Sequence, residues 1–333
     1  MTSRILAATL ALIATPLAAQ DYRSVIYVSP NPVGINDFLQ LGADGTRRIA
    51  EEMGLEAKIY ESSDPTVKLQ NLEAAAREAD IVVVITFEFD EILTEIATEH
   101  PETAFLQVDS CAPDAPENVH CSVFREHETA FLAGAEAALT SETGTIGAIG
   151  AVDIPFIHRY TDAFIAGARH AVPDIDVAPT LWIGGDNPFA DPARGQQRAT
   201  IMASGGADRI LTAASGTNGG VFRALEDFPG AAGFGVDVNQ CLQAPGTVMD
   251  NIEKNTDVVI EMGVRGIIEG TQPALVALGL ADDGMTLTGL EPGVEDSECL
   301  IAEYPEVIEQ VAALRDAIVA GEIEVADPMQ MAR

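Results

Sequence analysis

Polar side chains follow several predicted strands at the positions where parallel sheets bind small molecules. Asp109 ends the run FLQVD, Asp153 follows TIGAIGAV, the turn 215–217 follows RILTAA, and Asp237 ends GFGV. Ligands of open parallel sheets bind beyond the carboxyl ends of the strands, where such groups form hydrogen bonds. Each aspartate alone could instead cap a helix or a loop. Their shared position favours contact with a small ligand.

Aromatic residues occupy similar strand-to-helix loops or the first turns of helices. They are Phe38, Phe87, Phe89 and Phe189. Lys254, in the run NIEKNTD, is one of three lysines in the whole chain. Its ammonium group could neutralise Asp237 and donate to a ligand hydroxyl or carbonyl, or it could be a solvated surface charge.

Catalytic motifs are weak in this sequence. It contains no GxSxG, HExxH or GxxxxGK[ST], and GTIGAIG has the spacing GxxGxxG, which is not the dinucleotide fingerprint GxGxxG. His120 and His127 favour loop hydrogen bonds over catalysis. We therefore expect a protein that is not an enzyme and has no cofactor.

The four cysteines are expected to form disulfides. Cys111 and Cys121 are close enough to close one short loop, which leaves Cys241 and Cys299 as the second pair. This pairing rests on proximity, since four cysteines allow three connectivities. Zinc is the alternative, but no CxxC occurs and the five histidines are scattered, so no metal site is expected.

Residues 1–19 have the pattern of a cleaved signal peptide. A basic Arg4 precedes an apolar stretch, and the run PLAAQ offers a small-residue cleavage site. The alternative is a buried N-terminal helix. No cysteine follows the apolar stretch, so a lipid-anchor signal is not expected. We expect export to the periplasm, where disulfides form.

Composition and charge narrow the class of protein. The chain has 333 residues, of which 47% are hydrophobic, and it carries 18 Lys and Arg against 52 Asp and Glu, a formal charge of −34. Such a charge repels phosphate backbones and anionic lipid headgroups, so neither nucleic acid nor membrane insertion is expected. It also favours a neutral or weakly charged ligand over a multiply charged anion.

The hydrophobic pattern predicts an α/β fold with parallel sheets. Apolar runs alternate with amphipathic segments, which is typical of repeated βαβ units. The predicted strands are 24–29, 57–60, 81–86, 105–109, 145–150, 177–183, 209–214 and 232–236. The predicted helices are 38–53, 67–78, 91–99, 128–139, 155–171, 192–204, 219–226, 258–269 and 305–320.

The same design occurs twice, so two lobes are expected. The first would comprise residues 20–124 plus about 238–275, and the second residues 125–237 plus about 276–333. No long Ser-, Gly- or Pro-rich linker separates the units, which favours a short hinge over a flexible tether.

Five stretches carry a resemblance to a known family. They are FLAGAEAALTSETGTIGAIGAVDIPFIHRYTDAFIAGARH, PETAFLQVDS, NPFADPARGQQRATIMASGGADRIL, AASGTNGG and GVDVNQCLQAPGTVMDNIEKNTD. Together they resemble the basic membrane protein family of ABC-transporter substrate-binding proteins, which includes purine nucleoside receptors. The resemblance extends in order over about residues 38–270.

This resemblance implies the fold of a type I periplasmic binding protein, with two Rossmann-like lobes joined by three crossovers. In nucleoside-binding members, aromatic side chains from both lobes sandwich a purine, and aspartate and lysine near the hinge hold the ribose. By motif, Phe38 and Phe189 resemble the sandwich. The residues that resemble the polar contacts are Asp109, Gly216, Asp237 and Lys254.

The sequence departs from the family pattern before the first long helix. Members usually carry a segment of the type DDKSFNQ, whereas this chain has GINDFLQLGADG, with Leu39 at the usual asparagine position. Asn36 and Asp37 precede Phe38 instead, and Asp37 is the candidate for the displaced polar contact. A purine nucleoside, a free nucleobase and another flat heterocycle all remain open as ligands.

The resemblance implies a solute-binding protein that delivers a small molecule to an inner-membrane ABC permease. A ligand-sensing receptor would have the same fold. A periplasmic enzyme that processes nucleosides is a third hypothesis, which the missing catalytic motifs disfavour.

Overall fold

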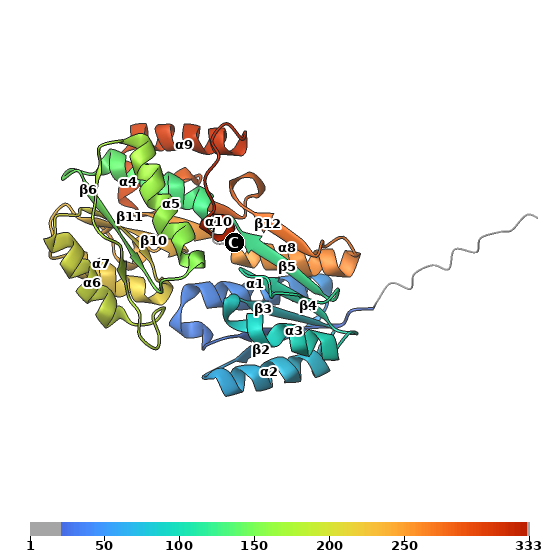
Figure 1. Cartoon of the computed structure of the whole chain (residues 1–333). Coiled ribbons are helices and arrows are strands. Elements are labelled where there is room, and N and C mark those ends of the chain that lie inside the picture. Colours follow the sequence, from blue (N-terminus) through green and yellow to red (C-terminus); the bar gives the residue numbers. More distant parts are fainter. Residues whose placement is uncertain (1–20, 332–333) are drawn as a thin grey trace, which may run out of the picture.

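The computed structural model describes residues 21–331, which form two α/β lobes. Figure 1 shows the lobes side by side, with the first around α2 and α3 and the second around α5 and α6. The expected signal peptide lies outside the described residues. Within them, no helix combines the length and apolar character that crossing a bilayer requires.

The first lobe is built on a six-stranded parallel sheet in the order β12-β5-β4-β3-β1-β2. Its strands are β1 (Ser24–Ser29), β2 (Glu56–Glu61), β3 (Ile81–Ile85), β4 (Ala104–Val108), β5 (Val119–Phe124) and β12 (Leu275–Leu278). Successive side chains of a strand point to opposite faces, and both faces are covered here. The central strands are therefore continuously apolar, as in IVVVI of β3.

Two pairs of helices cover this sheet. They are α1 (Asp37–Met53) with α8 (Thr256–Glu269), and α2 (Pro65–Glu78) with α3 (Asp90–Glu99). Val25 and Tyr27 of β1 belong to the same core cluster as Ala43 of α1, whereas Ile26 belongs to the cluster of Leu72 in α2. The lobe is thus a three-layer sandwich with a core on each side of the sheet.

The second lobe has a mixed sheet in the order β13-β11-β10-β9-β6-β7, with β8 also pairing with β6. Its strands are β6 (Thr145–Gly150), β7 (Asp176–Val177), β8 (Leu181–Trp182), β9 (Arg209–Ala213), β10 (Ala232–Asp237), β11 (Val248–Lys254) and β13 (Met285–Leu287). All pairings are parallel except that of β13 with β11. The predicted strand 177–183 is two short strands.

The helices of this lobe are α4 (Glu126–Thr140), α5 (Pro155–Ala171), α6 (Pro192–Ser204), α7 (Asn218–Leu225), α9 (Pro305–Val319) and α10 (Pro328–Met331). Helices α4 and α5 cross closely because each has a glycine at the contact. A Cβ atom on Gly134 or Gly167 would lie 1.8 Å from a backbone oxygen of the other helix. Helices α9 and α10 pack on α4 and α5, respectively.

Three connections join the lobes, at Arg125 between β5 and α4, at Asn255 between β11 and α8, and between β12 and β13. The fold class and the three crossovers agree with the sequence analysis. One boundary differs: residues 248–254 pair with β10 and belong to the second lobe, whereas 238–275 was assigned to the first. Because VMDNIEK contains several polar residues, its hydrophobic pattern does not indicate a buried strand.

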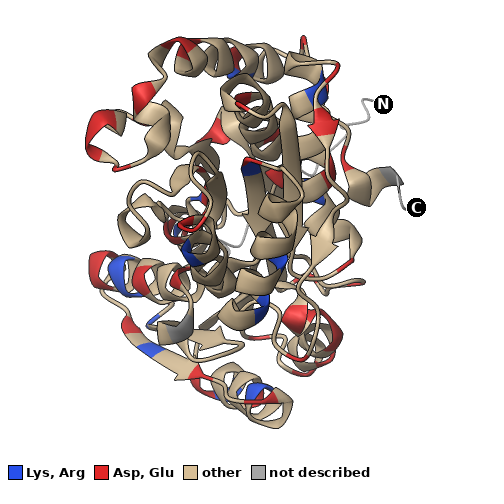
Figure 2. Cartoon of the chain, turned by 90° about the vertical axis from the view of Figure 1, so that its left-hand side faces the viewer, with Lys and Arg blue, Asp and Glu red and all other residues tan. Residues whose placement is uncertain are grey.

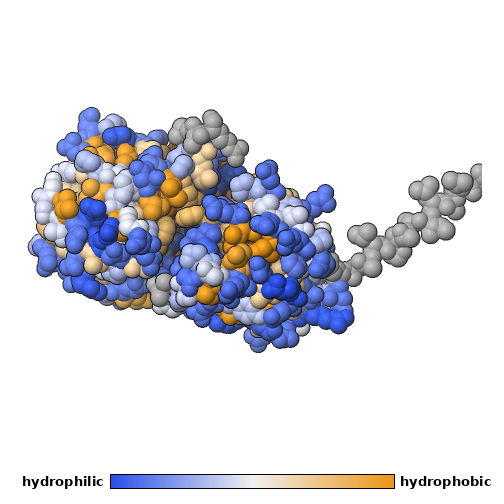
Figure 3. Space-filling view, turned by 60° about the horizontal axis from the view of Figure 1, so that its bottom comes forward, coloured by the Kyte–Doolittle hydropathy of each residue, from blue (hydrophilic) through white to orange (hydrophobic). Residues whose placement is uncertain are grey.

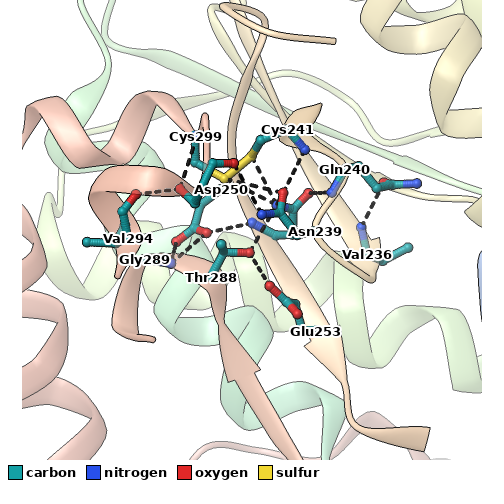
Figure 4. Close-up of a disulfide and its surroundings, with 12 residues drawn as sticks. Val236, Asn239, Gln240, Cys241, Asp250, Glu253, Thr288, Gly289, Val294 and Cys299 are labelled. Atoms are coloured by element: carbon teal, nitrogen blue, oxygen red, sulfur yellow. Dashed lines mark hydrogen bonds between the residues drawn. A yellow bond between two sulfur atoms is a disulfide. The ribbon is translucent and has the colours of Figure 1, made fainter. Parts of the chain in front are cut away.

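Both expected disulfides form. Cys111 is bonded to Cys121 and Cys241 to Cys299, with sequence separations of 10 and 58. Figure 4 shows the second bond beside β11 and the turn at Gly289. The amide of Asn251 lies 3.2 Å from Cys241 Sγ. This disulfide therefore ties the segment after β10 to the chain after β13.

We predict that the two disulfides stabilise the fold unequally. In the chain-entropy model the double variant Cys241→Ser/Cys299→Ser loses about 4 kcal/mol of unfolding free energy, and Cys111→Ser/Cys121→Ser about 3 kcal/mol, because the first bond closes the longer loop. Urea unfolding at pH 7 measures both losses. A larger loss for the shorter loop would contradict the prediction.

A buried pair of carboxyl groups lies between α4 and β11. Asp250 Oδ1 accepts hydrogen bonds from the backbone N–H groups of Asn251 (2.7 Å) and Gly289 (2.9 Å). Glu136 Oε1 is buried with no donor among the described residues. Burial, with Asp250 as neighbour, raises the pKa of Glu136 well above its ordinary value, and burial raises that of Asp250 to about 7. The pair therefore retains a proton in the folded protein.

We predict that Glu136→Gln changes how stability depends on pH. A carboxyl whose pKa is raised by folding stabilises the folded state below its unfolded pKa, and this contribution is lost as pH rises through the folded value. Between pH 5 and pH 8 the unfolding free energy of Glu136→Gln should therefore rise, relative to the original protein, by roughly 1–3 kcal/mol. Urea unfolding at both pH values measures this, with the exposed Glu95→Gln as control. A constant difference would contradict it.

Candidate ligand-binding cleft

A cavity of about 660 Å³ lies between the lobes, lined by residues of both. Residues at the carboxyl ends of strands surround it, and four of them have left-handed backbone conformations. The φ angles are 76° for Thr86, 77° for Asp109, 50° for Ser215 and 76° for Asp237. Such a conformation costs a non-glycine residue on the order of 1–3 kcal/mol. The fold maintains this backbone strain around the cavity, and strained residues of this kind cluster at the functional sites of proteins.

Aromatic side chains from both lobes form much of the cavity wall. Phe38 of α1 and Phe87 of a short 3₁₀ helix (Phe87–Phe89) come from the first lobe. Phe156 and Phe189 come from the second, and the ring centroid of Phe87 lies 5.8 Å and 6.5 Å from theirs. The lobes therefore meet through rings. In the space-filling view they join along a groove, and the face shown is mostly hydrophilic (Figure 3).

Lys254, at the end of β11, is buried among aromatic rings and carboxylates. Its ammonium group forms ion pairs with Asp109 of the first lobe and, at 3.1 Å, with Glu126 of α4. The Glu126 contact lacks hydrogen-bond alignment. The ring centroids nearest to Lys254 Nζ lie 5.1 to 5.4 Å away and belong to Phe38, Phe124, Phe156 and Tyr160. Ring faces attract cations, so both interactions favour the charged amine.

The charge network continues to the end of the chain. Arg159 of α5 donates to Glu126 Oε2 at 3.0 Å and to both oxygens of Asp327 at 2.8 and 2.7 Å. Such a bidentate pair fixes both groups. The segment before α10 is thereby linked to the base of the cleft, and Figure 1 places α10 near the junction of the lobes.

Burial shifts the pKa values of these groups. Burial raises the pKa of Asp109 to about 6 although Lys254 acts in the opposite direction, and it also raises that of Asp237. Burial alone would lower the pKa of Lys254, but the carboxylates around it, above all Asp109, raise it well above the ordinary value. The carboxylates therefore favour a charged Lys254 at neutral pH, and the raised pKa of about 6 makes Asp109 easier to protonate than an ordinary aspartate.

The structure brings five of the predicted residues to this cavity: Phe38, Asp109, Phe189, Asp237 and Lys254. The other two, Asp37 and Gly216, line an adjoining pocket of about 160 Å³. There Asp37 Oδ2 accepts a hydrogen bond from Gln243 Nε2 of the second lobe at 2.8 Å. Asn36 lines both spaces, and its side chain caps α1 by accepting from Leu39 N.

Several sequence expectations need correction. Lys254 pairs with Asp109 and Glu126 as its nearest carboxylates, whereas Asp237 was expected as its partner. Asp237 instead accepts from Ser215 Oγ at 2.8 Å. Asp153 forms an ion pair with His158. Phe89 is fully buried in the core of the first lobe.

Four groups at the site are not among the residues predicted from the sequence: Phe156, Tyr160, Glu126 and Arg159. Phe156 and Tyr160 are four residues apart on α5, directly after a strand, so helical spacing could have identified them. Glu126 and Arg159 stand in polar surroundings in the sequence, and nothing there signals their burial.

The described residues contain no group of three or more His, Cys, Asp or Glu side chains placed to hold a metal ion. Acidic residues outnumber basic ones over both lobes in Figure 2, in line with the formal charge of −34.

Two α/β lobes that enclose a cavity at the carboxyl ends of their strands form the architecture of two-lobed solute-binding proteins. A family model described as "ABC transporter substrate-binding protein PnrA-like" matches residues 28–328, and the chain belongs to this Bmp family. The family implies a small-molecule ligand and a permease partner. The resemblance drawn from the sequence is thereby confirmed.

Relatives and solved structures agree with this assignment. The CD4+ T-cell-stimulating antigen of Listeria monocytogenes is 25% identical over 92% of this chain and 89% of its own. Basic membrane protein A1 of Borrelia garinii is 30% identical over 66% and 64%. A crystal structure of an ABC transporter solute-binding protein from Aeropyrum pernix has a TM-score of 0.79 at 25% identity, covering 92% and 94% of the two chains.

Some relatives bear on the N-terminal expectation. An uncharacterised protein of Pyrococcus abyssi, 26% identical over 85% of this chain and 70% of its own, is named a lipoprotein. That name differs from the expectation that no lipid-anchor signal is present here. The residues concerned lie outside those that the structure describes.

We predict that Lys254→Met destabilises the protein in a pH-dependent way. The variant leaves Asp109 as a buried carboxylate without its cation, while Glu126 keeps only Arg159, which should cost about 3–5 kcal/mol of unfolding free energy at pH 8. The loss should be smaller at pH 5, because Asp109 becomes protonated there. Its pKa is already raised to about 6, and the variant removes Lys254, which lowers that pKa in the original protein.

Urea unfolding at the two pH values measures the effect. Lys58→Met serves as a control, since the Lys58 side chain is 44% exposed. An equal loss at both pH values would contradict the prediction.

Proposed function

We propose that this protein is the exported binding component of an ABC importer and that it binds a purine nucleoside, or a related flat heterocycle, between its lobes. The single observation that carries the proposal is the interlobe cavity, in which rings from both lobes lie beside Asp109 and Asp237. Rings favour a flat partner and carboxylates favour hydroxyl or N–H donors.

Stacking would supply most of the affinity. A base stacked on an aromatic side chain is worth about 1–3 kcal/mol. Phe38 and Phe189 are the proposed pair, and Phe189 already lies 6.5 Å from Phe87. Within the described chain no ring contact joins Phe38 to Phe189, as expected of two rings that hold a third between them.

Hydrogen bonds would supply selectivity. Ser215 Oγ engages Oδ2 of Asp237, and Oδ1 is left for a donor such as a ribose hydroxyl. Lys254 engages Oδ1 of Asp109. A site built around carboxylates rejects ligands that lack donors, because its acceptors would stay unpaired on burial. In this proposal Lys254 orients Asp109 and does not itself donate to the ligand.

Closure of the lobes would couple binding to delivery. The three connections at the base of the cleft form a hinge, and a ligand shifts the lobes toward the closed state only by its better contacts there. The closed protein would then present both lobes to an inner-membrane permease. The proposed location is the periplasm, after removal of residues 1–19.

We predict that purine nucleosides stabilise the protein against thermal unfolding. Inosine, guanosine, adenosine, purine bases and simple sugars are compared at millimolar concentration. A ligand present at 100 times its Kd adds about 2.7 kcal/mol to the free energy of unfolding, so the unfolding temperature should rise by several degrees. Stabilisation by sugars with none by any purine compound would reject the ligand class.

Two cleft variants locate the site. Asp237→Asn keeps a side chain that tolerates the left-handed backbone, and both it and Phe189→Ala should weaken nucleoside binding at least about tenfold, as expected for a lost charged hydrogen bond or a lost stacked face. The exposed Asp227→Asn is the matched control. Unchanged affinity in both cleft variants would refute the site.

A further inference from the structure

The charges at the base of the cleft do not balance. Lys254 and Arg159 supply two positive charges, and the carboxylates in contact with them or beside them are four: Asp109, Glu126, Asp327 and Asp237. These four carboxylates are 0 to 9% exposed. Buried charge that is not compensated is costly. With all four carboxyl groups ionised, the cluster has an excess of two negative charges.

The rest of the cavity wall adds to this excess. Asp64, Glu88 and Asp186 also line the cavity, against one further lysine, Lys68. Lys68 Nζ already donates to the backbone oxygen of Glu88 at 2.8 Å and lies over the ring of Phe89. Both lysines of the wall are thus engaged, and no arginine lines the cavity among residues 21–331.

Two buried carboxylates keep acceptor capacity toward the ligand. Among the described contacts, Ser215 accounts for one oxygen of Asp237 and Lys254 for one oxygen of Asp109, and no hydrogen bond reaches the second oxygen of either. Both groups line the cavity. They point to a ligand that brings hydrogen-bond donors, positive charge or both.

The aromatic walls favour the same kind of ligand. Five rings line the cavity, those of Phe38, Phe87, Phe156, Tyr160 and Phe189. The face of a ring carries negative electrostatic potential, and rings combined with carboxylates are how proteins bind cationic groups that are only weakly hydrated. A neutral sugar hydroxyl could pair with Asp237 but would leave the charge excess unchanged.

We propose that the preferred ligand is a cationic flat heterocycle, such as a purine nucleoside with a ring nitrogen that is alkylated and positively charged. This inference rests on the function proposed above and narrows its ligand class. The ring would stack between aromatic side chains while its charge offsets the excess of carboxylates at the base of the cleft.

The test compares nucleosides that differ in charge, by isothermal titration calorimetry at pH 6.0 and low ionic strength. 1-Methyladenosine is a cation, and 1-methylinosine is neutral with the same methyl group. The cation 7-methylguanosine and neutral guanosine form a second pair. This pair is included because the pocket could exclude a methyl group at N1. We expect the cation to bind at least tenfold tighter in one pair, with the ratio falling as salt is added.

The outcomes separate the two proposals. If neutral nucleosides bind and neither cation binds tighter than its neutral counterpart, the charge proposal is overturned and the proposed function stands. If none of the four nucleosides, nor adenosine, binds, both are overturned.

Proton release gives a second readout. Asp109 faces Lys254, Glu126, Asp237 and Tyr160, and burial raises its pKa to about 6. A ligand cation lowers this pKa again, so binding at pH 6.0 should release a fraction of a proton. Titrations in buffers of different ionisation enthalpy measure it. Proton uptake on binding of the cation would overturn the proposal.

A charge-matched pair of double variants assigns the effect to the cavity. Glu88→Gln/Asp186→Asn removes two exposed carboxylates of the wall and should lower the cation-to-neutral affinity ratio about threefold or more. Glu95→Gln/Asp227→Asn removes the same charge at exposed positions outside the cavity and should preserve the ratio. An equal ratio in both double variants would show that the wall carboxylates Glu88 and Asp186 play no part in the preference for a cation.

Discussion

The contact of Lys254 with Asp109 and Glu126 is the interaction on which the cleft depends. It joins the end of β11, the end of β4 and the start of α4, and therefore both lobes next to two of their three connections. Taking these charges out of water is costly, and the cost is recovered only with close geometry and further partners. The surrounding rings and Arg159 provide those partners at the base of the cleft.

Much of the fold could be predicted because both sheets are buried on two faces. Strands such as IVVVI of β3 are then apolar throughout, and the amphipathic helices between them are easily recognised. Strand β11 could not be found in this way. Asp250, Asn251 and Lys254 are buried and polar, and each has partners that are distant in the sequence: Gly289 for Asp250, Thr288 for Asn251 and Asp109 for Lys254. The lobe boundary was misplaced for the same reason.

The candidate site was predictable where strand ends determine it and not where tertiary contacts do. Asp109 and Asp237 follow strands whose carboxyl ends must meet the cleft, so their lining of the cavity follows from the fold class. The partner of Lys254 does not follow, because the sequence alone does not tell which of several carboxylates lies nearest. Glu126 is fully buried, yet its sequence neighbours are those of an exposed helix start.

The contacts between the lobes at the mouth of the cleft set how much free energy a ligand would have to supply to hold the lobes together. Away from the pivot, the lobes touch through the Phe87 ring pairs and the hydrogen bond between Gln243 and Asp37. A ring pair contributes about 0.5–1.5 kcal/mol and such a hydrogen bond a similar amount. In the proposed closure, contacts this weak would leave the closed state only slightly favoured over an open one. On the proposed function, a ligand that adds stacking and charge compensation only when the lobes close would control the equilibrium, while the buried ion cluster, which lies beside two of the connections, would stay intact.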